Sequence, residues 1–346
     1  MTRTFPDVLT ALVRGQDVDA ETSGWVMDRI LAGDMSPVQV AGFVIALRAK
    51  GETVEEITGL ADAMLSHATD ITVTGDVVDV VGSGGDRANT VNVSTMAAIT
   101  AAAAGARVVK HGNRSASSAC GTADVLEELG VELNLAPAKQ QEIVDECGIC
   151  FLFAPHYHPA LKHSLMARRE LGVATTFNFL GPLANPARPA AQAVGIADER
   201  MADLVAGVMA RRRVRGLVFH GGDGLDELTT TTSSSVWVIN DGRAVRTTLD
   251  PAELGLPLAR VEDLVGAGPD HNARVVRDLV AGSTGAVRNI VVLNAAATLL
   301  AHAGPDPEAD LAAQLRPMIT RADTVLTDGT AAATLDRWVA ATPRAR

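Results

Sequence analysis

The sequence is poor in aromatic residues, cysteine and positive charge, and each shortage excludes some classes of protein. Aromatic side chains make up only 3% of the 346 residues, although 47% are hydrophobic. Ala, Val and Leu must therefore fill the interior, which favours helices packed closely on a parallel sheet. Because the chain exceeds the size at which one core usually stops growing, we expect two domains or one large domain with a smaller attachment.

The three cysteines are too few for a disulfide framework, and their odd number fits a reducing compartment. Cys147 and Cys150 have a CxxC spacing, but no second pair and no nearby His completes a zinc set. The pattern there runs from helix into strand, whereas redox CxxC motifs open a helix. Burial as small residues is the favoured interpretation.

An excess of acidic residues gives the chain a formal net charge of -11. Nucleic-acid and anionic-membrane binders need a basic field, so we expect neither partner. The most apolar stretches, 96–105 and 290–302, are too short to span a bilayer, and residues 1–20 contain no export signal. We therefore expect a cytoplasmic protein that holds any anionic ligand with local groups.

Helical signals fill the first 70 residues. Ser36 and Pro37 supply a cap and a first-turn proline, and the apolar residues that follow recur at helical spacing. Thr53 and Glu56 form a capping box for the next helix. This pattern predicts a small helical domain over residues 1–70, whose apolar stripes need a partner surface that a second subunit could supply.

Strands and helices alternate after residue 75, as is typical of a mostly parallel sheet. Apolar runs predict strands at 77–81, 107–110, 149–153, 191–196 and 216–220. Residues 236–240 and 243–247 flank Asp241-Gly242 as in a two-residue hairpin, which predicts one antiparallel edge strand. The chain from about residue 272 is mainly helical. The fold class is therefore α/β, with a small helical domain and a larger α/β domain over 75–346.

Two loops that follow predicted strands have the composition of a phosphate site. Gly82–Asp86 can turn backbone N–H groups toward an anion, although a tight turn explains its glycines equally well. Asn92–Thr95 then places amides and hydroxyls at a helix start, where Ser94 could also be only an N-cap. Lys110–Ser118 holds three potential cations and three hydroxyls, which suit a multiply charged ligand better than a solvated basic loop.

An acidic block, Asp223–Glu227, follows another strand. Adjacent carboxylates are not easily buried without a counterion, and their hard oxygens suit Mg²⁺ that bridges to substrate phosphates. An exposed acidic turn is the alternative. Cationic loops together with a carboxylate pair indicate a metal-bound polyphosphate.

These blocks, with Arg168–Gly172 and Phe177–Leu183, resemble in type and order those of the anthranilate phosphoribosyltransferases, over nearly the whole chain. The resemblance implies transfer of the phosphoribosyl group of phosphoribosyl pyrophosphate (PRPP) to the amine of anthranilate in tryptophan biosynthesis, with two Mg²⁺ ions per active site. It also implies the nucleoside phosphorylase and phosphoribosyltransferase type of fold. Helices from about 160–185 would join the small domain, and a homodimer would form through it.

The resemblance further implies individual roles. Lys110, Asn113 and Arg168 form the expected catalytic set, in which Asn113 and Arg168 hold anthranilate. Ser94 and Glu227 would serve one Mg²⁺ ion, and Asp226 and Glu227 a second. The remaining substrate-binding residues are expected to be Gly82, Gly85, Asp86, Thr90, Asn92, Val93, Ser94, Thr95, His111, Gly112, Arg114, Ser115, Ser117, Ser118 and Thr122. Ser83, Thr122 and Ala174 depart from the usual family residues, but no expected ligand is lost.

The implied chemistry is substitution at an anomeric carbon. Lys110 and Mg²⁺ would stabilise charge on the leaving pyrophosphate. The attacking aromatic amine is already neutral at pH 7, so Arg168 and Asn113 would act mainly by positioning anthranilate. His111 could accept a proton or serve as a hydrogen-bonding scaffold, and the sequence leaves both open.

Two rival functions remain. A pyrimidine nucleoside phosphorylase has a similar fold and similar glycine and Lys-His-Gly-Asn-Arg blocks, but it uses inorganic phosphate and needs no metal-bound pyrophosphate. The pair Asp226-Glu227 and Arg168 favour the transferase. A relative that has lost catalysis and binds nucleic acid would need a basic surface, which the net charge opposes.

Overall fold

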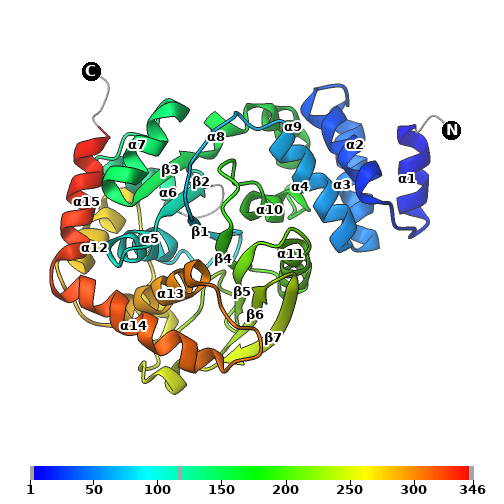
Figure 1. Cartoon of the computed structure of the whole chain (residues 1–346). Coiled ribbons are helices and arrows are strands. Elements are labelled where there is room, and N and C mark those ends of the chain that lie inside the picture. The colour runs from blue at the N-terminus through cyan, green and yellow to red at the C-terminus, as the bar shows by residue number, and fades with distance from the viewer. Residues whose placement is uncertain (1–3, 116–118, 343–346) are drawn as a thin grey trace.

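The computed structural model describes residues 4–115 and 119–342. Four helices come first: α1 (Phe5–Val13), α2 (Ala20–Leu31), α3 (Pro37–Lys50) and α4 (Val54–Ser66). The expected capping box of Thr53 and Glu56 starts α4, and Ser36 forms another with Gln39 at α3. Helices α2 and α4 meet backbone to backbone, since a Cβ on Gly59 would lie 2.1 Å from the carbonyl oxygen of Ala20. The four helices form one end of the molecule (Figure 1).

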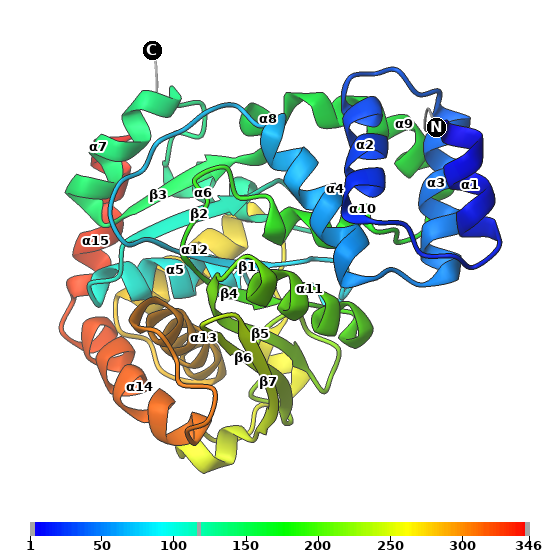
Figure 2. The ribbon, with the colours of Figure 1, turned by 45° about the vertical axis from the view of Figure 1, so that its right-hand side comes forward.

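Short helices from the middle of the chain pack on this end. They are α8 (Ala154–Tyr157), η1 (Pro159–Leu161), α9 (Lys162–Leu171), α10 (Phe177–Leu180) and η2 (Gly181–Leu183). Helix α9 contacts α2 and α3, and Ala167 and Phe177 belong to the same hydrophobic core as α1–α4. Figure 2 shows α9 and α10 beside the N-terminal helices. Segments about 100 residues apart in sequence therefore share one core.

A seven-stranded sheet forms the centre of the larger part. Its strand order is β3-β2-β1-β4-β5-β6-β7. The strands are β1 (Val78–Gly82), β2 (Val108–Gly112), β3 (Ile149–Phe153), β4 (Ala191–Gly195), β5 (Arg215–Gly221), β6 (Ser234–Asn240) and β7 (Arg243–Leu249). The first five are parallel, whereas β6 is antiparallel to both of its neighbours.

One detail of the expected sheet was wrong. The hairpin exists, but its first strand pairs with β5 while its second forms the edge. The strand that runs against the others is therefore β6, one position in from the edge, and the edge strand β7 runs with the parallel set. The mostly parallel sheet and the helical N-terminus confirm the α/β class.

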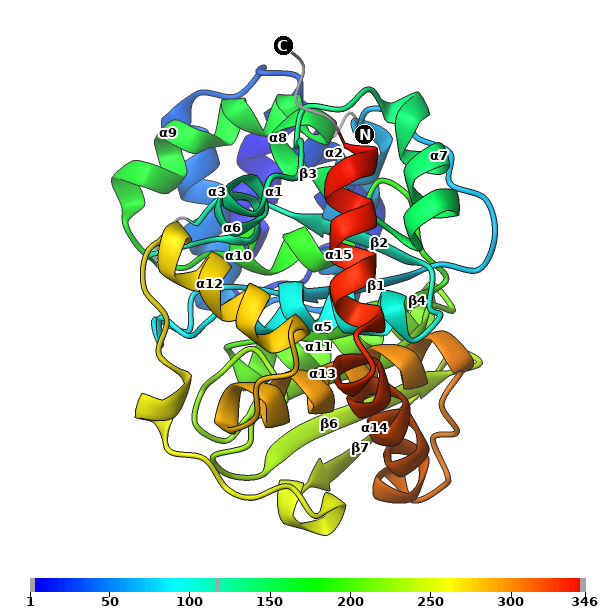
Figure 3. The ribbon, with the colours of Figure 1, turned by 90° about the vertical axis from the view of Figure 1, so that its left-hand side faces the viewer.

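Helices cover both faces of the sheet. Neighbouring residues such as Ala193 and Val194 on β4 enter two different cores, because side chains alternate along a strand. On one face lie α5 (Val93–Ala103) and α13 (Ala286–Ala303), with α6 (Thr122–Leu129), α7 (Pro137–Cys147), α12 (Pro269–Val280), α14 (Leu311–Thr327) and α15 (Thr330–Ala341) around them (Figure 3). On the other lies α11 (Glu199–Arg211). The turns η3 (Pro251–Leu254) and η4 (Val261–Leu264) connect β7 to α12.

The expectation that the apolar stretches are too short to span a bilayer was wrong for residues 290–302. They belong to the longer helix α13, which is the one helix in the described chain long and apolar enough to cross a membrane, although 72% of it is buried inside the protein. Cys147 and Cys150 are buried and form no disulfide, which confirms the interpretation of the CxxC spacing.

Candidate active site

The glycine loop begins where β1 ends, at the point where the strand order reverses between β1 and β4. Gly84 and Gly85 have φ angles of 68° and 90°, and a Cβ on either would meet no atom within 4 Å. Hydrogen bonds to the end of β4 hold the loop in place. Ser83 donates its N–H to the carbonyl oxygen of Gly195 at 2.9 Å, and the Ser83 hydroxyl accepts from the N–H of Ala197 at 3.1 Å. The open side of the loop thus offers room for an anion at the crevice typical of such sheets.

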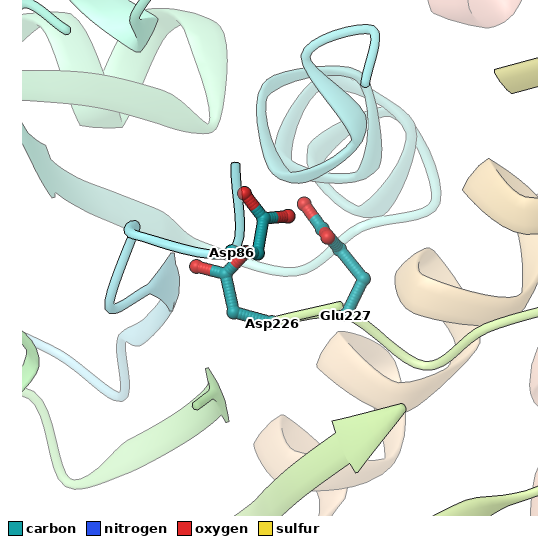
Figure 4. Close-up of side chains that lie close together, drawn as sticks. All are labelled: Asp86, Asp226 and Glu227. Carbon is teal, nitrogen blue, oxygen red and sulfur yellow. The ribbon is translucent and has the colours of Figure 1, made fainter. Parts of the chain in front are cut away.

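Three carboxylates meet beside this loop. Ligand atoms of Asp86, Asp226 and Glu227 all lie within 4.8 Å of one another, and Figure 4 shows the three side chains directed toward a common point. Asp86 comes from the loop after β1, and the other two come from the loop after β5. Asp226 also accepts a hydrogen bond from the N–H of Gly84 at 2.6 Å. The acidic block is therefore part of the glycine loop's site.

The electrostatics of the cluster favour a bound cation. Burial, and then the charge of Asp86, raise the pKa of Asp226 to about 7. Burial and the neighbouring carboxylates raise the pKa of Glu227 well above its usual value, and burial raises that of Asp86. Glu227 Oε2 has no hydrogen-bond partner among the described residues. The charge of Lys110 opposes this rise at Glu227 without cancelling it, and oxygen donors of this kind fit a divalent ion that prefers oxygen ligands.

Lys110 lies on β2 next to the cluster. It is only 1% exposed, and its ammonium donates to the carbonyl oxygen of Val80 at 2.6 Å and to Ser94 Oγ at 3.1 Å. Burial lowers the pKa of Lys110 to about 8, against the charges of Asp79, Glu227 and Asp226. The helix N-cap is Asn92 rather than Ser94, so the alternative in which Ser94 is only an N-cap is wrong.

The other residues expected to bind PRPP surround the start of α5. Val93 and Thr95 are fully buried, and the Thr95 hydroxyl lies 3.5 Å from that of Thr122 at the start of α6. Asn92 donates its side-chain amide to Cys120 and accepts from Asn272 at 2.8 Å, so this side chain joins the start of α5 to the segment before α6 and to α12. Thr90 forms an isolated bridge to Val265.

The cationic loop is described only in part. Asn113, Arg114 and Ser115 follow β2, whereas the expected ligands Ser117 and Ser118 lie outside the described residues. Arg114 pairs with Asp124 at 2.8 Å and Glu127 at 3.0 Å on α6. The structure thus gives Arg114 a role in holding the loop to α6, which the local composition did not indicate.

His111 is buried at the end of β2, and its ring lies 5.3 Å from that of His158. Burial, followed by the charge of His158, lowers the pKa of His111 to about 3. A Cβ on Gly112, the next residue, would lie 3.1 Å from the ring of Phe151. A ring that stays neutral at pH 7 is a weak base, so the structure favours a role for His111 as a hydrogen-bonding scaffold over a role as proton acceptor.

Arg168 lies in the last turn of α9, half-buried. Its guanidinium lies 5.4 Å from the ring of Phe177, and it forms no salt bridge with an acidic side chain in the described part of the chain. Burial lowers its pKa. A half-buried cation without an acidic partner suits an anionic ligand such as a carboxylate.

Comparison with known proteins identifies the family to which this fold belongs. Residues 74–332 match the glycosyl transferase family a/b domain, and residues 6–68 match its helical bundle domain. The fold and the site therefore define a glycosyltransferase with a helical bundle and an α/β domain.

Relatives identify the branch of that class. The anthranilate phosphoribosyltransferases of Nocardioides sp. and Thermobifida fusca are 56% and 54% identical, over 99% and 97% of this chain and 99% and 96% of theirs. The crystal structure of the Thermus thermophilus enzyme has a TM-score of 0.89 and 39% identity, and covers 97% of this chain and 99% of its own. The Saccharomyces cerevisiae enzyme in complex with PRPP and Mg shares the fold, with a TM-score of 0.87, 24% identity and coverage of 99% and 98%. The chain belongs to the anthranilate phosphoribosyltransferase family.

Proposed function

We propose that this chain transfers the phosphoribosyl group of PRPP to the amine of anthranilate, giving N-(5-phosphoribosyl)anthranilate and pyrophosphate in tryptophan biosynthesis. The observation that carries the proposal is the meeting of Asp86, Asp226 and Glu227 with the open glycine loop and the buried Lys110. Carboxylates of raised pKa beside backbone N–H groups and an ammonium suit a metal-bound polyphosphate. A site for inorganic phosphate alone would not need the three carboxylates, so they favour the transferase over a nucleoside phosphorylase.

Two Mg²⁺ ions per site are part of the proposal. Ser94 and Glu227 would hold one ion, and Asp226 and Glu227 the other, with Asp86 close to the second. Bound Mg²⁺ supplies positive charge that stabilises the leaving pyrophosphate.

The chain's own residues supply the rest of the chemistry. The N–H groups of Gly85 and Asp86 and the N-terminus of α5 bind the phosphates, together with Thr90, Thr95 and Thr122. Lys110 adds a charge that is already desolvated and so stabilises the leaving group strongly.

Arg168 pairs with the anthranilate carboxylate, and Asn113 orients the ring. The aromatic amine needs no strong base, which agrees with the neutral state of His111. Catalysis therefore rests on positioning and on charge stabilisation.

One assay tests the function. The purified protein, with anthranilate, PRPP and Mg²⁺, should deplete anthranilate fluorescence, and EDTA should stop the depletion. Parallel incubation with a pyrimidine nucleoside and inorganic phosphate tests the rival activity. Phosphorolysis without loss of anthranilate signal would overturn the proposal in favour of a phosphorylase.

We also propose a cytoplasmic homodimer formed through the helical part, in which residues 1–70 with helices from 160–185 form the small domain and 75–346 the larger one. Val13 on α1, Val38 on α3, and Leu165 and Met166 on α9 are 56–81% exposed. Helices α1 and α9 both pack against α3, so these apolar side chains belong to one group of helices. Apolar exposure of this kind is typical of a subunit interface.

The dimer is tested by the mass of the particle in solution. Light scattering should give about twice the mass of one chain, and Val38→Asp with Leu165→Asp should give single chains. Leu258→Asp, at an exposed apolar residue outside the helical part, is the matched control. A wild-type protein that runs as one chain at all concentrations would refute the proposal.

A further inference from the structure

A buried acidic side chain just after α3 joins the N-terminal helices to the turn that carries Phe177. The Glu52 side chain is fully buried. Its Oε2 pairs with Arg200 and lies 3.6 Å from Arg48, while its Oε1 accepts the hydroxyl of Thr176 at 2.8 Å. Because a buried charge is tolerated only when it is paired and hydrogen-bonded, each of these contacts is tightly constrained.

The turn that begins at Thr176 is held at two points. Thr176 is the N-cap residue of α10, and its hydroxyl binds Glu52. Three residues later, the ring of Phe179 lies 5.5 Å from the guanidinium of Arg48, which also contacts Glu52. Phe177 lies between these two points, so the contacts around Glu52 hold the backbone on both sides of its ring.

The ring of Phe177 is in turn the surface on which Arg168 lies, at 5.4 Å. An arginine is usually oriented by a carboxylate, but Arg168 forms no salt bridge with one in the part of the chain that the structure describes. Its direction in the absence of substrate therefore depends on packing against Phe177. A shift of that ring would shift the guanidinium.

We propose that Glu52 and Thr176 are positioning residues for the acceptor substrate: their hydrogen bond fixes Phe177, and through Phe177 it fixes the guanidinium of Arg168 for the anthranilate carboxylate. This inference rests on the proposed role of Arg168. The PRPP side of the site is independent of the hydroxyl of Thr176, because the glycine loop is held by Gly195 and Ala197.

The chain offers a matched set of variants. Thr176→Val removes the hydroxyl at nearly constant volume, and Thr176→Ser keeps it. The adjacent Thr175 is equally buried, at 1% exposure, and its hydroxyl has no hydrogen-bond partner among the residues described. Thr175→Val is therefore the control for loss of a buried hydroxyl that holds nothing.

The measurements are the KM for anthranilate, kcat, and the Kd for PRPP with Mg²⁺ by calorimetry. Loss of one orienting hydrogen bond should raise the anthranilate KM of Thr176→Val by about three- to tenfold, with the PRPP Kd unchanged within about twofold. Thr176→Ser and Thr175→Val should both match wild type. If Thr176→Val does not fold, Phe177→Leu, which removes the ring but keeps the Glu52 contact, should give the same selective rise.

Three results would overturn the inference. An unchanged anthranilate KM in Thr176→Val, or in Phe177→Leu where that variant decides, removes the positioning role. Equal weakening of PRPP binding shows a general loss of structure, and an equal effect in Thr175→Val shows a response to any buried change. Arg168→Ala separates the two proposals. If this variant does not raise the anthranilate KM, the proposed role of Arg168 is wrong. If Arg168→Ala raises the KM but Thr176→Val and Phe177→Leu do not, only the positioning inference is wrong.

Discussion

Removal of the charges of Asp226 and Glu227 should stabilise the metal-free protein while abolishing its response to Mg²⁺. The perturbation is the double variant Asp226→Asn with Glu227→Gln, which keeps side-chain size and leaves an oxygen to accept the N–H of Gly84. Burial raises the pKa of both carboxyls in the folded protein. A carboxyl whose pKa is raised on folding contributes stability at low pH, and that contribution is lost as pH rises through the folded pKa. Asp226, which is ionised at pH 8, therefore destabilises the metal-free fold.

The size of the effect follows from Asp226, which is 7% exposed. The rise of its pKa from 3.8 to about 7 corresponds to roughly 4 kcal/mol at most above pH 7. Because the charge of Asp86 is part of the cause and remains in the variant, we expect about 2–4 kcal/mol. For a chain of this length each kcal/mol changes Tm by about 1–2 °C, so the variant should melt about 2–8 °C higher.

Thermal melting with EDTA at pH 8 and pH 5 is the assay. The gain in Tm should be largest at pH 8 and should shrink at pH 5, where wild-type Asp226 is largely protonated. Added Mg²⁺ should raise the Tm of wild type, as mass action requires for a ligand of the folded state, but not that of the variant. Turnover should be lost at ordinary Mg²⁺ concentrations. Asp278→Asn, an exposed carboxylate on α12, is the control and should change neither property.

Two results would refute this reasoning. A variant that melts below wild type in EDTA at pH 8 would mean that ionised Asp226 stabilises the fold, so desolvation would not dominate. A variant that keeps the wild-type Mg²⁺ shift would put the ion at other residues.

Three further predictions concern the substrate ligands. Arg168→Ala should raise the anthranilate KM at least about tenfold and leave the PRPP Kd nearly unchanged, because it removes the proposed carboxylate partner; equal losses in calorimetry would contradict this. Gly82→Ala, whose Cβ would lie 2.2 Å from Asp226 Oδ2, should disturb the carboxylates and lower Tm. In Gly84→Ala the new Cβ meets no protein atom, so the variant should lose only about 1–2 kcal/mol of stability through backbone strain, but it should bind PRPP more weakly. If PRPP raises the Tm of Gly84→Ala as much as that of wild type, the loop does not bind the phosphates. Because the pKa of Lys110 is lowered to about 8, PRPP affinity should fall as pH rises through that value, and Lys110→Met should remove this dependence; a pH profile of the Kd that is the same in both proteins would exclude Lys110 as its origin.

Several features of the site could be predicted from local sequence because they are local in origin. The glycine loop, the cationic loop and the acidic block each follow a strand directly, and the ends of parallel strands meet at one edge of a sheet. The burial of Cys147 and Cys150 could likewise be predicted from the local sequence. These inferences needed only short-range patterns.

Other features depend on contacts between distant segments. Asp86 joins Asp226 and Glu227 although β1 and β5 are not neighbours, since β4 lies between them. The approach is possible because Gly195 at the end of β4 has no side chain; a Cβ there would lie 1.6 Å from the carbonyl oxygen of Asp226. A glycine at a strand end was the available signal, but glycine alone does not say which segment approaches it.

The sequence by itself determined the elements, the class of fold and the chemical character of each loop, because helix caps, strand periodicity and loop composition act over a few residues. Only the tertiary structure decided how these side chains are used. It pairs Arg114 with acidic residues on α6 and joins Asn92 to Asn272 by a hydrogen bond. It also joins Glu52 to the turn that carries Phe177, against which Arg168 packs. Such pairings depend on which helices and loops pack together, and a side chain's partners set its charge, its orientation and its availability to a ligand.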